Sequence, residues 1–150
     1  MNESRHLADE AATLAYGSHL AKWLRAPANR RAIVFLRGQL GAGKTTLVRG
    51  ILRAFGHQTA VKSPTYTLLE PYEDLDPAVL HFDFYRLGDS EELDFIGLDE
   101  LLDSKAVKLI EWPERADSRL PIPDLEICLS LDGSGRRIDV RTPATQTDTQ

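Results

Sequence analysis

Residues 38–45 read Gly38-Gln39-Leu40-Gly41-Ala42-Gly43-Lys44-Thr45. The spacing is glycine, four residues and then Gly-Lys-Thr, which is the pattern of the phosphate-binding P-loop. An apolar run at residues 32–36 precedes the loop and predicts a buried strand, and residues 46–55 carry apolar side chains at helical spacing. Strand, glycine-rich loop and helix in this order are the context that the motif needs, so the stretch predicts a nucleotide-binding α/β domain.

The residue types of this loop define the chemistry that we expect from it. Glycine has no Cβ atom, so the backbone can wrap around a phosphate group and turn several N–H groups towards it. The positive end of the following helix dipole adds to that attraction. Lys44 is expected to reach the β- and γ-phosphates, and the Thr45 hydroxyl to ligate Mg²⁺. The alternative interpretation is a glycine-rich turn with a surface lysine.

Length and composition predict one globular domain. The chain has 150 residues, of which 42% are hydrophobic and 27% are charged, which is ordinary for a soluble protein. We expect a single domain over residues 1–142 and a disordered tail over residues 143–150. No apolar run approaches the roughly 20 residues of a membrane span, and the single Cys128 excludes an internal disulfide. These features predict a cytoplasmic protein that does not associate with membranes.

One part of the second half of the chain is strongly acidic. Residues 89–103 contain seven acidic side chains and no basic one, which argues against a general nucleic-acid-binding surface there. Such a face could dock a basic protein partner, and a solvated helical face is the simpler interpretation.

The segments before and after the loop predict a helix and a hairpin. Residues 4–24 favour an amphipathic helix with Ser4 as its N-cap. Residues 66–72 and 79–85 are rich in strand-forming residues and are separated by a turn, which predicts an antiparallel hairpin.

The remaining segments complete the predicted fold. Residues 90–102 predict one or two short helices interrupted near Gly97, and residues 106–112 predict a strand that ends before a proline. Residues 125–131 and 136–142 flank a glycine-rich turn and predict a final hairpin. The expected fold is a P-loop NTPase-like three-layer α/β/α domain with a mixed sheet and antiparallel hairpins.

Two acids follow predicted strands. Asp83 comes after the apolar residues 79–82, and Glu111 comes after residues 107–110. The carboxyl ends of strands are where α/β sheets place ligand contacts, and P-loop enzymes use an acid there to hold Mg²⁺. Spacing alone does not rank the two acids, and for either one a carboxylate paired with Lys or Arg is an equal alternative.

Other residues carry weaker signals. Thr65, in the segment Ser63-Pro64-Thr65, could sense Mg²⁺ and the γ-phosphate as a switch threonine does, although a turn hydroxyl is the favoured interpretation. His81, Tyr85 and Trp112 are expected to be packed core residues.

The ordered set of motifs resembles the TsaE (YjeE) family, bacterial ATPases that assist threonylcarbamoyladenosine modification of tRNA. The resemblance covers roughly residues 13–121. It is carried by Gly38-x-Leu40-Gly41-Ala42-Gly43-Lys44-Thr45-Thr46, Ser63-Pro64-Thr65-Tyr66, His81-Phe82-Asp83-Phe84-Tyr85-Arg86-Leu87 and Ile110-Glu111-Trp112-Pro113-Glu114. One departure is Gln39, where the family usually has an acid, and it removes a charge from the loop.

The resemblance implies roles for individual residues. Lys44, Thr65 and Glu111 would be catalytic, and Thr45, Asp83 and Glu111 would hold the metal. The nucleotide-binding set would be Gly38, Gln39, Leu40, Gly41, Ala42, Gly43, Lys44, Thr45, Thr46 and Trp112.

The resemblance also implies cofactors and partners. ATP and Mg²⁺ would be the cofactors, and hydrolysis would be slow for the protein alone and modulated by its partners. Those partners would be TsaD and TsaB, which transfer the threonylcarbamoyl group to an adenosine near the anticodon. The protein would meet tRNA only indirectly, through that assembly.

Two other functions are compatible with a P-loop. A small-molecule kinase would need a substrate pocket and often a lid, and no arginine-bearing lid segment is visible. A GTPase-like switch module would carry an Asn-Lys-x-Asp segment, and the only asparagines are Asn2 and Asn29, both before the loop. A small-molecule substrate is expected only under the kinase alternative.

Overall fold

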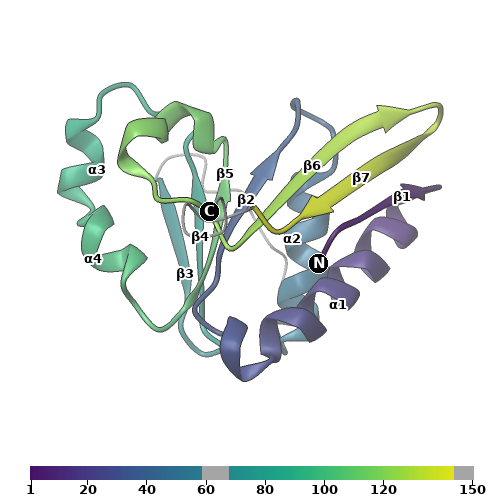
Figure 1. Ribbon diagram of the computed structural model, residues 1–150, viewed down its shortest axis with the longest axis horizontal. Helices are drawn as coiled ribbons and strands as arrows, with labels where there is room; N and C mark the ends of the chain where they lie inside the picture. Colours follow the sequence, from purple (N-terminus) through teal and green to yellow (C-terminus); the bar gives the residue numbers. More distant parts are fainter. Residues whose placement is uncertain (59–67, 144–150) are drawn as a thin grey trace, which may run out of the picture.

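The computed structural model describes residues 1–58 and 68–143, and they form a seven-stranded sheet in the order β1-β7-β6-β2-β5-β4-β3 (Figure 1). The strands are β1 (Glu3–Leu7), β2 (Ile33–Arg37), β3 (Leu69–Tyr72), β4 (Val79–Asp83), β5 (Val107–Glu111), β6 (Leu125–Asp132) and β7 (Gly135–Arg141). The pairs β6/β2, β2/β5 and β5/β4 are parallel. The pairs β1/β7, β6/β7 and β3/β4 are antiparallel. The predicted mixed sheet with its two hairpins is therefore confirmed.

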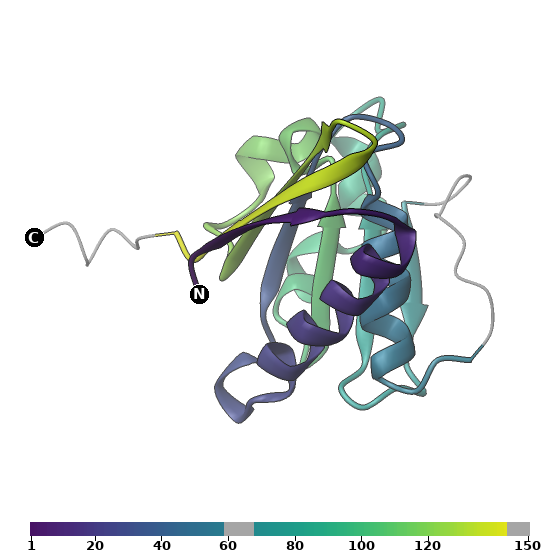
Figure 2. The same cartoon turned by 90° about the vertical axis from the view of Figure 1, so that its right-hand side faces the viewer.

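Helices lie on both faces of the sheet. The helices α1 (Glu10–Arg25) and α2 (Lys44–Ala54) run side by side on one face, while α3 (Glu91–Phe95) and α4 (Leu98–Leu102) lie on the other (Figures 1 and 2). Two 3₁₀ helices, Pro27–Asn29 and Pro113–Arg119, connect elements. No helix within the described residues is both long and apolar enough to cross a membrane.

The N-terminal segment differs from its prediction. The single helix predicted over residues 4–24 is wrong, because the chain first forms β1 and only then enters α1. The Ser4 hydroxyl donates to the Asp139 carboxylate on β7 and caps no helix. The N-cap is Asp9, whose carboxylate accepts from the Ala12 N–H at 2.8 Å. Pairing with β7 decides the conformation of these residues, and nothing local in the sequence signals that partner.

The other predicted elements are found close to their expected bounds. The break between α3 and α4 lies at Gly97, which has φ 70° and forms the N-cap of α4. Three predictions lie outside the described residues: the start of the strand over residues 66–72, the segment containing Thr65, and the tail after residue 143.

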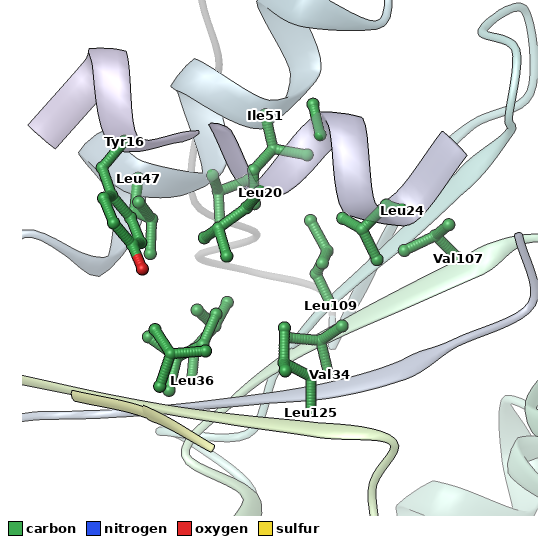
Figure 3. Packing of buried hydrophobic residues seen from close by; sticks show 14 of the residues in the cluster. Tyr16, Leu20, Leu24, Val34, Leu36, Leu47, Ile51, Val107, Leu109 and Leu125 are labelled. Carbon is green, nitrogen blue, oxygen red and sulfur yellow. The ribbon is translucent and has the colours of Figure 1, made fainter. Parts of the chain in front are cut away.

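The central strands are buried on both faces of the sheet. Their successive side chains point to opposite faces, and helices cover each face. On β2, Val34 and Leu36 face α1 and α2, whereas Phe35 packs with the α3 and α4 side. Figure 3 shows the cluster of buried apolar side chains between the sheet and the helices α1 and α2. Its labelled members are Tyr16, Leu20, Leu24, Val34, Leu36, Leu47, Ile51, Val107, Leu109 and Leu125. A continuous apolar run is what such a strand requires.

The helices α1 and α2 approach each other through two glycines. A Cβ atom on Gly17 would lie 2.8 Å from the backbone carbonyl carbon of Gly50, and one on Gly50 would lie 2.5 Å from the Leu14 carbonyl oxygen. Both distances are too short for real contacts, so the two backbones can pack this closely only if both residues are glycine. Because α2 starts directly after the glycine-rich loop, this contact also positions that loop.

We predict that Gly50→Ala destabilises the protein, although alanine is the better helix former. Relief of the clash needs backbone movement, so the free energy of unfolding should fall by about 1–3 kcal/mol, against a gain of about 0.5–1 kcal/mol expected in an open helix. Urea denaturation measures the change. Gly88→Ala is the control, because its Cβ atom would meet only Glu92 Oε1 at 3.6 Å. A more stable Gly50→Ala variant would contradict the close approach.

Candidate functional site

A cleft of about 1290 Å³ opens at the carboxyl ends of the parallel strands. The loop of residues 38–45, called the glycine loop below, forms its floor, because it leaves β2 and leads into α2. The ends of β4 and β5 form one wall. The β1–α1 junction, with Asp9 and Thr13, and the β6–β7 turn, with Ser134 and Arg136, form the other. This volume exceeds the roughly 300–1,000 Å³ of typical small-molecule and cofactor sites, so the cleft has room for such a ligand.

All three glycines of the glycine loop, Gly38, Gly41 and Gly43, have a positive φ that favours glycine. Gly38 has φ 152°, and a Cβ atom there would lie 2.7 Å from the Leu129 carbonyl oxygen on β6. Gly43 has φ 106° and is the N-cap of α2, where its carbonyl oxygen accepts from the Leu47 N–H at 2.9 Å. The loop therefore folds tightly against β6 and begins α2 with N–H groups at the cleft.

Most of the predicted nucleotide-binding set lines the cleft. The residues that do so are Leu40, Gly41, Gly43, Lys44, Thr45, Thr46 and Trp112. Gly38, Gln39 and Ala42 belong to the loop but are not part of the cleft lining, and Ala42 is buried beneath it. Thr65 lies outside the described residues, so its predicted role stays a prediction.

Lys44 lies in the cleft among groups of opposite charge and an aromatic ring. Its Nζ donates to the Gly38 carbonyl oxygen at 2.5 Å and lies 3.8 Å from the centroid of the Trp112 ring. Burial lowers the pKa of Lys44, while the carboxylates of Glu111 and Asp83 act in the opposite direction. A phosphate group in this cleft would supply the charge that best stabilises the ammonium form.

Asp83 and Glu111 are neighbours because of the sheet register. The two residues are paired across β4 and β5, and Glu111 is also paired with Leu36 at the end of β2. Asp83 accepts from the Tyr85 N–H at 3.0 Å. Burial raises the pKa of Asp83, and the nearby Glu111 carboxylate raises it further. A cation between the two acids would relieve this repulsion.

Glu111 is held by a histidine that the sequence did not mark as part of a site. Glu111 is 2% exposed, and its Oε2 lies 2.6 Å from Nε2 of His81, which is completely buried. His81 is a buried residue, as predicted, but it also contacts a candidate functional residue. The two lie on adjacent strands and 30 positions apart, so no spacing in the sequence could have paired them.

Trp112 follows Glu111 with an uncommon backbone conformation. Its φ is 56°, the one positive value among the non-glycine residues that the structure describes. Such a conformation in a bulky residue costs of order 1–3 kcal/mol and is concentrated at functional sites. The turn places the ring over Lys44 and 5.0 Å from the Tyr85 ring. The prediction that Trp112 and Tyr85 are core aromatics needs correction, since both line the cleft.

Arg136 is a second residue that the sequence did not reveal. From β7, its Nε donates to the Ala42 carbonyl oxygen and its guanidinium to the Gly41 carbonyl oxygen, both at 3.1 Å. By binding carbonyl groups of the glycine loop, Arg136 fixes the orientation of the peptide groups whose N–H ends face the other way. It lies more than 90 positions from the loop, and only the closing hairpin brings it there.

The oxygen atoms of this site suit a magnesium ion. Asp83, Glu111 and Thr45 all line the cleft and supply carboxylate and hydroxyl oxygens, which Mg²⁺ prefers. Within residues 1–58 and 68–143, no group of three or more His, Cys, Asp and Glu side chains is placed to hold a metal ion. Mg²⁺ is usually held by one or two carboxylates together with substrate phosphates and water, so the residues present fit it.

Comparison with known proteins gives consistent matches. The family model described as "Threonylcarbamoyl adenosine biosynthesis protein TsaE" matches residues 7–138. A tRNA threonylcarbamoyladenosine biosynthesis protein TsaE from Haemophilus influenzae is 41% identical over 138 residues, which is 91% of this chain and 87% of that protein. The protein of the same name from Bacillus subtilis is 36% identical over 118 residues, covering 79% of this chain and 73% of its own.

A solved structure shares the fold. The crystal structure of YdiB from Bacillus subtilis superposes with a TM-score of 0.74 over 95% of this chain and 87% of its own, at 24% sequence identity. At this identity the match supports the arrangement of helices and strands alone.

We predict that Arg136→Met weakens the binding of ATP expected for this loop by about tenfold, which corresponds to about 1.4 kcal/mol. The loop would lose two charged donors to its carbonyl groups, so its N–H groups would be less well ordered before binding. Isothermal titration calorimetry measures the affinity. Arg137→Met is the matched control, because the neighbouring Arg137 is exposed and pairs with Asp139 at 3.2 Å. Equal affinities for the two variants would exclude this role for Arg136.

Proposed function

Because the chain belongs to the TsaE family of threonylcarbamoyl adenosine biosynthesis proteins, we propose that it is a Mg²⁺-dependent ATPase with a P-loop. In this proposal it acts as an accessory protein in threonylcarbamoyladenosine modification of tRNA, together with TsaD and TsaB. Its hydrolysis of ATP drives or resets their assembly, and it meets tRNA only through them.

One observation carries the ATPase proposal. The glycine loop with Lys44, the Asp83 carboxylate and the Glu111 carboxylate converge on one cleft from the ends of three adjacent parallel strands. A phosphate cradle, a mobile cation and two acids are the parts that phosphoryl transfer from a nucleotide requires. Lys and Arg are the usual partners of a purely structural carboxylate, and within residues 1–58 and 68–143 neither Asp83 nor Glu111 forms an ion pair with either type.

The loop and Lys44 bind the phosphates of ATP in this mechanism. The N–H groups at the start of α2 donate hydrogen bonds to the phosphate oxygens, and the Lys44 ammonium leaves the Gly38 carbonyl oxygen for a phosphate oxygen. The exchange replaces a neutral acceptor by an anionic one, which adds the attraction between opposite charges to the hydrogen bond. Trp112, directly over Nζ, keeps water away from this side of the ammonium group.

The acids act at the γ-phosphate end. Asp83 and the Thr45 hydroxyl would hold Mg²⁺, which neutralises charge on the phosphate oxygens when bound. Glu111 is paired with Asp83 across β4 and β5, so it is available to orient the attacking water and accept its proton. Since His81 occupies one Glu111 oxygen, the orientation of that carboxylate is set before the substrate arrives.

Slow turnover fits a role in controlling an assembly. An arginine that stabilises the transition state can raise phosphoryl transfer by ~10³–10⁵. Arg136, which lines the cleft, has its guanidinium engaged with the Gly41 and Ala42 carbonyl oxygens. A partner that changes the site would therefore change the rate. Loss of the γ-phosphate, sensed at Trp112 and Glu111, would couple hydrolysis to partner release.

The test is hydrolysis and tRNA modification in one reconstituted system. Purified protein is expected to release phosphate from ATP slowly, at a rate that changes when TsaD and TsaB are added, and to be needed for repeated rounds of modification. Lys44→Ala should lose most ATP affinity, because the loop loses its mobile cation. Full modification by Lys44→Ala, or over many rounds without the protein, would contradict the proposal. Transfer of phosphate to a small molecule would favour the kinase alternative.

We predict that substitution of the two acids affects different steps, with Asp83 acting in ATP binding and Glu111 in hydrolysis. Asp83→Asn should weaken Mg²⁺-dependent binding of ATP, since a metal ligand loses its charge. Glu111→Gln should lower turnover with little change in affinity, because it alters a group that acts during the reaction. Calorimetry with and without Mg²⁺ and single-turnover hydrolysis measure the two effects. If both variants hydrolyse ATP at the normal rate, both acids are structural.

A further inference from the structure

We infer that His81 is a positioning residue, which donates a hydrogen bond from Nε2 to Glu111 and thereby holds that carboxylate at the cleft. The inference rests on the proposed function for its effect on hydrolysis, while the hydrogen bond itself is independent of it. It concerns a buried residue of β4 that does not line the cleft and touches no nucleotide in the mechanism above.

The contact has a geometry that packing alone does not explain. Nε2 of His81 and Oε2 of Glu111 are 2.6 Å apart, and the two side chains are 0% and 3% exposed. Without His81, a carboxylate so far from solvent would lose this side-chain hydrogen bond. A buried polar group left without a partner costs about 1–3 kcal/mol, more when it is charged, so His81 determines where the Glu111 carboxylate can lie.

The surroundings of the imidazole ring assign its proton. Nδ1 of His81 is buried and has no hydrogen-bond partner among residues 1–58 and 68–143. A buried N–H without an acceptor is rarer in proteins than an acceptor without a donor. A carboxylate such as that of Glu111 carries no proton to donate and can only accept. The neutral ring with its proton on Nε2 therefore satisfies the pair, and Nδ1 carries the lone pair.

The hydrogen bond between His81 and Glu111 joins two adjacent strands of the sheet. His81 lies on β4 and Glu111 lies on β5. The parallel register pairs Asp83 with Glu111 and His81 with Leu109, so His81 lies two residues before the end of β4 that faces the cleft. His81 thus contacts Glu111 from below the site. Phe82, which lies between them, packs in the core cluster of α3 and α4, so His81 and Asp83 both point to the opposite face of the sheet.

A matched pair of substitutions tests the role in hydrolysis. His81→Gln keeps an N–H donor near the position of Nε2, whereas His81→Met has a similar length and no donor. We expect single-turnover hydrolysis to fall ~10–100-fold in His81→Met and to be largely retained in His81→Gln, as for other residues that orient a ligand from behind. The affinity for Mg²⁺-ATP should change by less than about threefold in both variants, because the binding groups stay in place.

The chain offers a control of the same chemistry. His19 on α1 contacts Glu3 on β1 with 2.9 Å between Nε2 and Oε1, away from the cleft. His19→Met removes an imidazole–carboxylate contact without touching Glu111, and we expect wild-type turnover. Wild-type turnover in His81→Met would overturn the inference. Equal loss in His81→Gln and His81→Met would also overturn it, because packing and not donation would then explain the effect.

Nitrogen NMR of the full chain separates this inference from the proposed function. The ¹⁵N shifts of the His81 ring should show a protonated Nε2 and an unprotonated Nδ1. A ring protonated on Nδ1 alone would overturn the inference whatever the protein hydrolyses. If the wild-type protein does not hydrolyse ATP, the proposed function fails, and the ring assignment still decides whether His81 donates to Glu111.

Discussion

The parallel pairing of β2, β5 and β4 is the constraint on which the site depends. Parallel strands end at the same edge of a sheet, so the register that joins Leu36 to Glu111 and Glu111 to Asp83 brings the glycine loop and both acids to one cleft. A shift of this register by one residue would turn Glu111 to the opposite face of the sheet. Such a shift would also exchange the side chains that pack on the two faces, which are Val34 and Leu36 on one face and Phe35 and Ile110 on the other.

Charge in the cleft is balanced among few groups. Burial acts on Lys44 and Asp83 in opposite ways, lowering the pKa of the first and raising that of the second, and their mutual attraction opposes both effects. Glu111 is tied to His81, so it has less freedom than Asp83 to follow a ligand. A nucleotide with its metal would bring both a negative and a positive charge into this arrangement, which is how one cleft can accommodate a lysine and two acids.

Close contacts between backbone segments fix the position of the glycine loop in the cleft. Gly17 and Gly50 let α1 and α2 touch, Gly38 lets the loop touch β6, and Arg136 ties the loop to β7. Trp112 reaches its place over Lys44 only through a strained backbone. The loop is therefore held between two helices and the closing hairpin, so movement of that hairpin would shift the glycine loop.

Local chemistry in the sequence was enough to predict the glycine loop, the strand before it and the helix after it, the hairpins, and Asp83 and Glu111 as acids at strand ends. Each of these depends on residues close together in the chain, whose turns, periods and breakers act locally. The tertiary structure alone decided that residues 3–7 form a strand, since their partners on β7 are 129 to 137 positions away. It also decided that Arg136 meets the loop, that His81 meets Glu111, and that Trp112 covers Lys44. These contacts join residues that no spacing relates, because strand order and register set them, and those follow from how the whole core packs.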